Sequence, residues 1–176
     1  GPKTHKAYKQ CLLNRKYLKD NMHRYKNIIF AGKWSAMIEK GQFDDLKLII
    51  DKSAKLGINV FVMAGPYIYK KNPLNYFLRS IYFGFPFDIT TIDGNDTLMT
   101  NANKRIKELS KRYSNVHFID RALLFATNNT FNVDGIIIPY SLDGRHISIL
   151  GSKYSAKYFM QKDEYEKLIS LFNLHK

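Results

Sequence analysis

Two titratable side chains stand three positions apart near the end of the chain. Asp143 and His146 flank Gly144 and Arg145 in the stretch SLDGRHIS, just ahead of a segment with helical apolar spacing. An aspartate so placed can hold the imidazole through Nδ1 and leave Nε2 to take a proton from a serine hydroxyl. The spacing therefore indicates two members of a Ser-His-Asp triad. A simpler interpretation makes Asp143 and Gly144 a turn, with Ser148 or His146 capping the next helix.

Several other catalytic signatures are absent from the sequence. It contains no G-x-G-x-x-G after a strand, no G-x-x-x-x-G-K-[ST], no H-E-x-x-H and no G-x-S-x-G. These absences argue against nucleotide-dependent enzymes, zinc proteases and the usual α/β-hydrolases. Cys11 is the one cysteine, which excludes an internal disulfide and a cysteine-based zinc site. No metal site is expected.

The charge balance favours polyanionic partners. The chain has 28 Lys and Arg against 15 Asp and Glu, a net charge of +13, which points to nucleic acid, an anionic membrane surface or an acidic glycan. Much of the excess lies in residues 3–26, where Asp20 is the one acid, although a solvated helix face is the simpler interpretation. Because no RNP-like or helix-turn-helix pattern accompanies the charge, specific nucleic-acid binding is not expected. No window has the roughly 20 apolar residues of a membrane span.

Helical and strand patterns alternate along the chain. Short apolar runs predict buried strands at 27–32, 58–65 and 115–120. Apolar residues at spacings of three and four predict helices near 5–25, 43–54, 74–82, 102–113, 147–160 and 165–172. This alternation predicts an α/β fold with a parallel sheet covered on both faces and functional groups at the carboxyl ends of its strands. Residues 3–176 read as one domain, and Gly1 and Pro2 as the remnant of a cleaved tag.

Three blocks of the sequence resemble a known family. YSLDGRHISILGSKYSAKYF is similar to the final D-x-x-H block of SGNH (GDSL-like) hydrolases, and more narrowly of the extracytoplasmic SGNH domain fused to membrane acyltransferase-3 proteins, which O-acetylate surface polysaccharides. NIIFAGKWS resembles the strand of that subfamily that ends in an Ala-Arg-Trp-Ser-like sequence. INVFVMAGPYIYKKNP resembles its next strand and Pro-containing loop. The blocks extend from about Cys11 to Phe159.

The resemblance implies a three-layer α/β/α SGNH-like fold and assigns roles to five residues. His146 would be the general base and Asp143 its orienting partner. Trp34, Ser35 and Gly32 would line the substrate pocket, where ordinary SGNH enzymes carry an asparagine donor. For Trp34, packing of the aromatic ring against the edge of the sheet is an equally good interpretation.

The activity implied by the resemblance is O-acetyl transfer or ester hydrolysis on cell-envelope polysaccharide through a serine acyl-enzyme. No cofactor would be bound, because a membrane acyltransferase domain would use the acetyl donor, acetyl-CoA. The acceptor would be a polysaccharide or lipopolysaccharide. The domain would lie in the periplasm or on the extracytoplasmic side of the inner membrane.

The sequence departs from the family at the nucleophile. None of its ten serines follows Gly-Asp, and the family order places the first strands and the serine before residue 1. We therefore expect the C-terminal portion of an SGNH domain, with an incomplete sheet whose upstream part is a partner. Cys11 favours this interpretation, because it fits a disulfide with an upstream cysteine. The alternative is a catalytically inactive module that holds an acidic glycan with the same cleft and the basic N-terminal helix.

An incomplete sheet has a physical consequence. In the SGNH arrangement the first strand would lie beside residues 27–32, so its absence would leave unpaired backbone groups along that edge. We expect another segment, from this chain or from a neighbouring molecule, to cover the edge.

Overall fold

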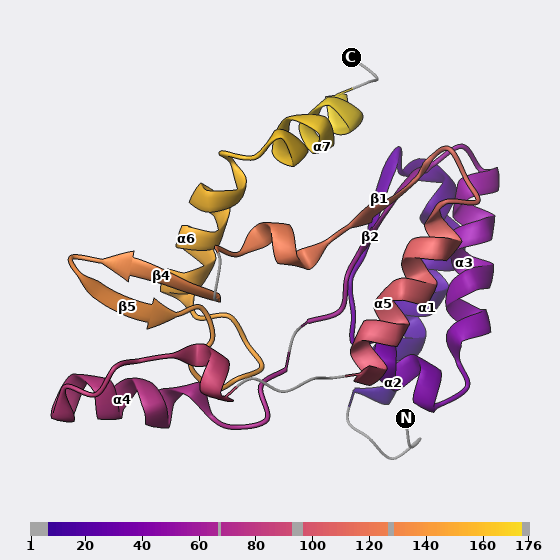
Figure 1. Cartoon of the computed structure of the whole chain (residues 1–176). Helices are drawn as coiled ribbons and strands as arrows, with labels where there is room; N and C mark the ends of the chain where they lie inside the picture. The colour runs from indigo at the N-terminus through magenta and orange to yellow at the C-terminus, as the bar shows by residue number, and fades with distance from the viewer. Residues whose placement is uncertain (1–6, 67, 93–96, 127–128, 174–176) are drawn as a thin grey trace.

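Three parallel strands form the sheet. The computed structural model describes residues 7–66, 68–92, 97–126 and 129–173 (Figure 1). Strands β1 (Asn27–Phe30), β2 (Asn59–Met63) and β3 (Val116–Ile119) lie in the order β1-β2-β3. Their register aligns Ile29 with Phe61 and Phe61 with His117. All three strands lie within the ranges that the apolar runs predict.

The main core lies between one face of this sheet and a group of helices. That group comprises α1 (Tyr8–Asn21), the 3₁₀ turn η1 (Met22–Arg24), α2 (Trp34–Glu39), α3 (Phe43–Lys55) and α5 (Thr97–Ser110). Val60 and Val62 of β2 share a buried cluster with Ile50 of α3 and Ile106 of α5, and all four are fully buried. Phe61, which lies between Val60 and Val62, is also fully buried, so both faces of β2 are covered.

On the opposite face of the sheet, the C-terminal helix α7 (Asp163–Asn173) packs against β2, and α6 (Ile149–Phe159) precedes it in the chain. The Phe61 ring stacks on Phe172 of α7 at a centroid distance of 4.4 Å and on His117 at 5.1 Å. Ile29, in the same row, is 54% exposed. Helices therefore lie on both faces, as predicted for an α/β fold, but the cover thins toward β1.

β1 is an edge strand. In the part of the chain that the structure describes, its strand neighbour is β2 alone. No other strand among the described residues therefore pairs with the free edge of β1. Cover by a neighbouring molecule stays a prediction.

The N-terminal helix is present, but most of its predicted apolar face is not buried. No residue of α1 is buried, and Leu12 and Leu13 are 47% and 61% exposed. Only Leu18 and the following Met22 reach the core. The physical reason is that the helix contacts the sheet through its last turn, so its basic face and Cys11 lie in solvent. No helix among the described residues is long and apolar enough to cross a membrane.

Several elements lie where the sequence analysis expected loops or made no assignment. The antiparallel strands β4 (Thr130–Val133) and β5 (Ile136–Pro139) form a hairpin. Its turn residues Asp134 and Gly135 have φ values of 49° and 87°, and an Asp-Gly pair between apolar runs is a strong hairpin signal. Helix α4 (Pro73–Phe83) matches the helix that the apolar spacing predicts near 74–82. Two 3₁₀ turns, η2 (Ile89–Ile92) and η3 (Arg121–Leu124), were not predicted.

Candidate functional site

Asp143 and His146 form a bonded pair on the loop between β5 and α6. His146 Nδ1 lies 2.6 Å from Asp143 Oδ2, and the His146 side chain is 83% exposed. Because Nδ1 faces the carboxylate, Nε2 is the nitrogen left for a second partner. The contact that the spacing predicts is present, and the imidazole points into solvent rather than into the interior.

The other carboxylate oxygen fixes the backbone of the loop. Asp143 Oδ1 accepts the backbone N–H groups of His146 at 2.7 Å and Arg145 at 2.8 Å, and the Ser141 hydroxyl lies 3.3 Å away. The backbone N–H of His146, then its ring, then the backbone of Arg145 hold the pKa of Asp143 well below its ordinary value. The carboxylate therefore stays ionised at every pH where histidine normally titrates.

The loop is anchored to the segment that leaves the carboxyl end of β2. The Tyr69 N–H donates to the Gly144 carbonyl at 3.1 Å, and the Leu74 N–H donates to the Leu142 carbonyl at 3.0 Å. Gly144 is buried with a φ of +80°, and a Cβ there would lie 3.2 Å from Pro73 Cδ. Both the left-handed backbone and the close approach require glycine. The pair is consequently held at the base of α4 (Figure 1).

The turn-and-cap interpretation also holds. Gly144 makes the turn, and Ser148 caps α6 by accepting the Gly151 N–H at 2.9 Å. The Ser148 N–H in turn donates to the Tyr140 carbonyl at 2.9 Å. The two interpretations are therefore compatible, because the hydrogen bonds that shape the turn also orient the carboxylate toward the ring.

Gly151→Ala is expected to lower the free energy of unfolding by about 1 to 3 kcal/mol. A Cβ at this position would lie 2.6 Å from the Tyr140 carbonyl oxygen and 2.8 Å from Ser148 Oγ, so the first turn of α6 must shift. Alanine ordinarily stabilises a helix relative to glycine, which makes a destabilisation diagnostic. Urea unfolding measures the effect. Ser152→Ala, in the same turn, is the control, and equal stabilities of the two variants would contradict the close contact.

Trp34 and Ser35 are buried, and Gly32 is half-buried. Trp34 is 4% exposed and Ser35 3% exposed. The indole Nε1 donates to the Met63 carbonyl at 2.7 Å, and a Cβ on Gly32 would lie 3.1 Å from the Trp34 ring. These contacts favour the packing interpretation of Trp34. The structure brings Asp143 and His146 together, whereas these three residues form a separate group around the buried indole at the start of α2.

A family model decides the classification of the chain. The model of the SGNH domain found fused to AT3 domains matches residues 3–161. The chain belongs to this family. Members of this family are SGNH domains that occur fused to AT3 domains.

The comparisons with curated proteins and with solved structures say less about the classification of the chain. No curated protein matches this SGNH domain. A solved structure from Streptococcus pneumonia, provisionally named as a platelet activating factor, is similar at 15% identity with a TM-score of 0.47. That likeness covers 77% of this chain and 58% of the other, so the SGNH domain spans less than two thirds of the length of that structure.

A small hollow of about 40 Å³ lies against the loop that carries Asp143 and His146 in this SGNH domain. Arg145 and Ser141 of the loop line it, together with Tyr69, Arg121 and Asn129. Burial raises the pKa of Tyr69 to about 12 and lowers the pKa of Arg121. Since arginine still stays charged at neutral pH, the hollow presents cationic and neutral donors to a small polar or anionic group. Nothing in the sequence marked these residues, which come from four separate segments.

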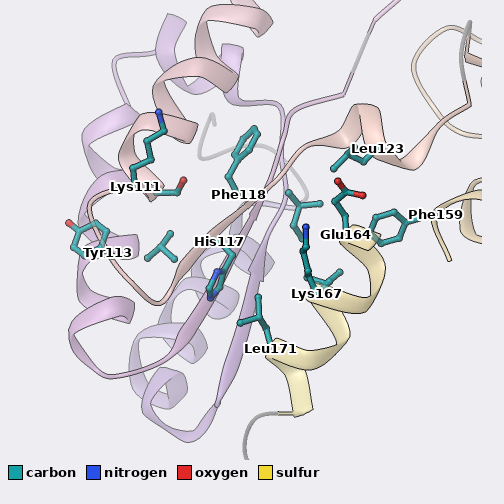
Figure 2. Close-up of a pocket in the computed structure, with 13 residues that line it drawn as sticks. Lys111, Tyr113, His117, Phe118, Leu123, Phe159, Glu164, Lys167 and Leu171 are labelled. Carbon is teal, nitrogen blue, oxygen red and sulfur yellow. The ribbon is translucent and has the colours of Figure 1, made fainter. Parts of the chain in front are cut away.

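A larger cavity of about 390 Å³ lies elsewhere, between β3 and α7. Figure 2 shows His117 and Phe118 on the strand and Glu164, Lys167 and Leu171 on the helix around it. Burial lowers the pKa of His117. None of the residues around this cavity belongs to the Asp143–His146 loop, so its size is no guide to the chemistry of the pair. Among the residues with described positions, no group of three or more His, Cys, Asp or Glu could hold a metal ion.

Proposed function

We propose that this SGNH domain is the Asp/His-bearing part of an O-acetyltransferase or esterase that acts on cell-envelope polysaccharide through a serine acyl-enzyme. The 2.6 Å contact between His146 Nδ1 and Asp143 Oδ2 carries the proposal. It favours the tautomer in which Nδ1 holds the proton and Nε2 can accept another. The exposure of the imidazole supports it further, because a serine and an acyl donor must reach the ring.

His146 acts as general base and then general acid. Its Nε2 takes the serine proton as the serine oxygen attacks the acyl carbonyl, and it returns that proton to the departing group. In the second half the imidazole takes the proton of the acceptor hydroxyl, whose oxygen attacks the serine ester, and it then gives that proton to the departing serine oxygen. The ionised Asp143 stabilises the imidazolium formed in each half, and backbone amides stabilise the oxyanion.

The serine is the group that this assignment still needs. Within the described ranges, the hydrogen bonds of His146 use its Nδ1 and its backbone N–H, and no serine hydroxyl bonds to Nε2. The nearby serines have other partners: Ser141 donates to Asp143, and Ser148 caps α6. The proposal therefore requires a serine from outside the present sequence, because none of its ten serines follows Gly-Asp.

The acetyl group comes from acetyl-CoA through the membrane acyltransferase domain, and the acceptor is a polysaccharide or lipopolysaccharide on the periplasmic side of the inner membrane. The fusion of family members to AT3 domains supports this arrangement. The cationic hollow beside the pair supports an acidic or strongly polar acceptor, since Arg121 and Arg145 both face it.

Polysaccharide acetylation by the full-length membrane protein tests the proposal. His146→Gln is expected to abolish it, because the amide cannot take the serine proton, while His23→Gln, on the exposed surface of η1, should leave it unchanged. Acetate released from purified polysaccharide by mild base gives the measurement. Full acetylation by His146→Gln would refute the role of general base. Glycan binding by a wild-type protein that transfers no acetyl group would favour the binding module instead.

A further inference from the structure

Arg121 is a half-buried cation without an acidic partner in the described part of the chain. It belongs to η3 and lines the hollow beside the Asp143–His146 loop. No ion pair or side-chain hydrogen bond of its guanidinium is found among the described residues, and its near neighbour is the Phe125 ring at 5.8 Å. A guanidinium keeps its charge in proteins, and a charge withdrawn from water is stabilised when an anion faces it. Arg121 can therefore hold an anionic ligand.

The acids closest in sequence to the two arginines of the hollow have other partners. Asp120 caps η3 by accepting the Ala122 N–H at 3.0 Å. Asp143 Oδ1 accepts two backbone N–H groups of its own loop, one of them from Arg145. Neither acid lines the hollow. The positive charge of Arg121 and Arg145 is therefore not neutralised by these two carboxylates, and a ligand can supply the counter-charge.

Neutral donors and aromatic rings form the rest of the hollow. Tyr69 lines it from the segment that follows β2, and because burial raises the pKa of Tyr69 to about 12, the hydroxyl keeps its proton at neutral pH. The Asn129 side chain bonds to this hydroxyl. The rings of Phe125 and Tyr140, 4.9 Å apart, form an apolar wall. One half-buried cation between flat rings matches a carboxylate, which is planar, carries a single charge and pairs with arginine through two parallel hydrogen bonds.

The size and charge of the hollow decide which anionic group can enter. A cavity needs roughly 10 to 15 Å³ to admit one water, so the hollow admits a group of about three heavy atoms, since its volume is about 40 Å³. A carboxylate that projects from a sugar fits this space, whereas a sugar ring does not. A phosphate monoester carries nearly two charges at neutral pH, which is more than one half-buried arginine neutralises. These limits favour a carboxylate.

The hollow and the imidazole share one loop. Arg145 and Ile147 line the hollow, and His146 lies between them in the sequence. The Tyr69 N–H holds this loop by donating to the Gly144 carbonyl at 3.1 Å. A sugar anchored by its carboxylate would therefore lie beside the exposed imidazole, where one of its hydroxyls can reach Nε2.

We propose that the hollow lined by Arg121 and Arg145 is a carboxylate subsite, which binds an acidic sugar of the acceptor polysaccharide and presents its hydroxyl to His146. Arg121 holds the carboxylate inside the hollow, and the exposed Arg145 closes its rim. The role in acetylation rests on the proposed function. Binding itself does not, because it needs neither the serine nor the acetyl donor.

Calorimetric titration of the chain with trigalacturonate, a trisaccharide of galacturonic acid, tests the carboxylate subsite. The carboxyl-reduced trisaccharide, in which each carboxylate becomes CH₂OH, should bind about tenfold more weakly or worse. Arg121→Met, which keeps an unbranched side chain in the hollow, should bind trigalacturonate about tenfold to hundredfold more weakly. Arg79→Met is the matched control, because Arg79 also lies beside a phenylalanine ring, 5.7 Å from Phe85. It should bind as the wild type does.

A second readout locates the contact. The Nε–H signal of Arg121 in the NMR spectrum should shift on addition of acetate or trigalacturonate, and that of Arg79 should not. Unchanged circular dichroism and thermal unfolding confirm that Arg121→Met is folded. Wild-type affinity in Arg121→Met, equal affinity for the reduced trisaccharide, or a wild type that binds neither probe overturns the proposal. Inorganic phosphate that displaces trigalacturonate at lower concentration than acetate does overturns it in favour of a phosphate site.

Acetylation by the full-length membrane protein separates this inference from the proposed function. Arg121→Met should raise the KM for a carboxylated acceptor more than the KM for its carboxyl-reduced form. A wild-type KM in Arg121→Met, together with loss of acetylation in His146→Gln, would overturn the carboxylate subsite alone. Trigalacturonate binding that depends on Arg121, together with full acetylation by His146→Gln, would support the subsite and overturn the proposed function alone.

Discussion

Replacing Trp34 with alanine is expected to lower the free energy of unfolding by about 3 to 5 kcal/mol. The indole is 4% exposed and belongs to the main core cluster. Its removal leaves a cavity against Gly32 and leaves the Met63 carbonyl without its 2.7 Å donor. Circular dichroism during urea unfolding measures the change, because Trp34 is the one tryptophan and the variant loses its fluorescence.

Two further variants help to explain the loss of stability in Trp34→Ala. Trp34→Phe keeps an aromatic ring but not the indole N–H, so it should cost less than the alanine, about 1 to 3 kcal/mol for the lost hydrogen bond. Leu48→Ala, at an exposed position on α3, should change stability by no more than about 0.5 kcal/mol. A Trp34→Ala protein of wild-type stability that binds acceptor glycan more weakly would restore the substrate-pocket interpretation.

Asp143→Asn is expected to reduce the rate of acetyl transfer by the full-length protein by about 10³- to 10⁴-fold. The asparagine carbonyl can still accept the backbone N–H groups of Arg145 and His146, so the loop should keep its shape. Its amide NH₂, however, would face Nδ1, which must then carry no proton. The remaining proton would lie on Nε2, the nitrogen that has to accept one from the serine.

The control for this variant is Asp44→Asn, which makes the same chemical change on the exposed first turn of α3 and should leave the rate unchanged. Thermal unfolding of Asp143→Asn near that of the wild type at neutral pH would separate a catalytic loss from unfolding. Because the folded-state pKa of Asp143 is lowered, the stability from its ionised form is present above the ordinary aspartate pKa and is lost only as the pH falls through the folded value. A wild-type rate for Asp143→Asn would contradict the proposed tautomer control.

The sequence predicts the sheet well because the physics that places its strands is local. Runs such as INVFVM are too short for a helix and too apolar for a loop, and their alternation with amphipathic helices leaves a parallel sheet as the natural arrangement. For α1 the periodicity predicts the helix but not its exposure, because it shows which residues share a face and not whether anything packs against that face. Leu12 lies on the predicted face and is 47% exposed.

In the candidate site, too, the sequence predicts local contacts and misses tertiary ones. Asp143 and His146 are close in sequence, so their contact follows from the loop itself. The surroundings of the pair depend on tertiary contacts: Tyr69 and Arg121 reach the hollow from distant segments, and no spacing rule connects them. For Trp34 the sequence predicts the position, at the end of a strand. It cannot show that the ring turns inward onto the Met63 carbonyl.

The attachment of the reactive loop also has a consequence for dynamics. Its main-chain bonds run to Tyr69 and Leu74, outside the strands of the sheet, so the imidazole depends on a unit that can open while the sheet remains folded. Amide hydrogen exchange at Leu74 would then report transient opening of the reactive loop at a lower free energy than exchange at Val62. A ligand that closes this unit would slow the first rate and leave the second unchanged.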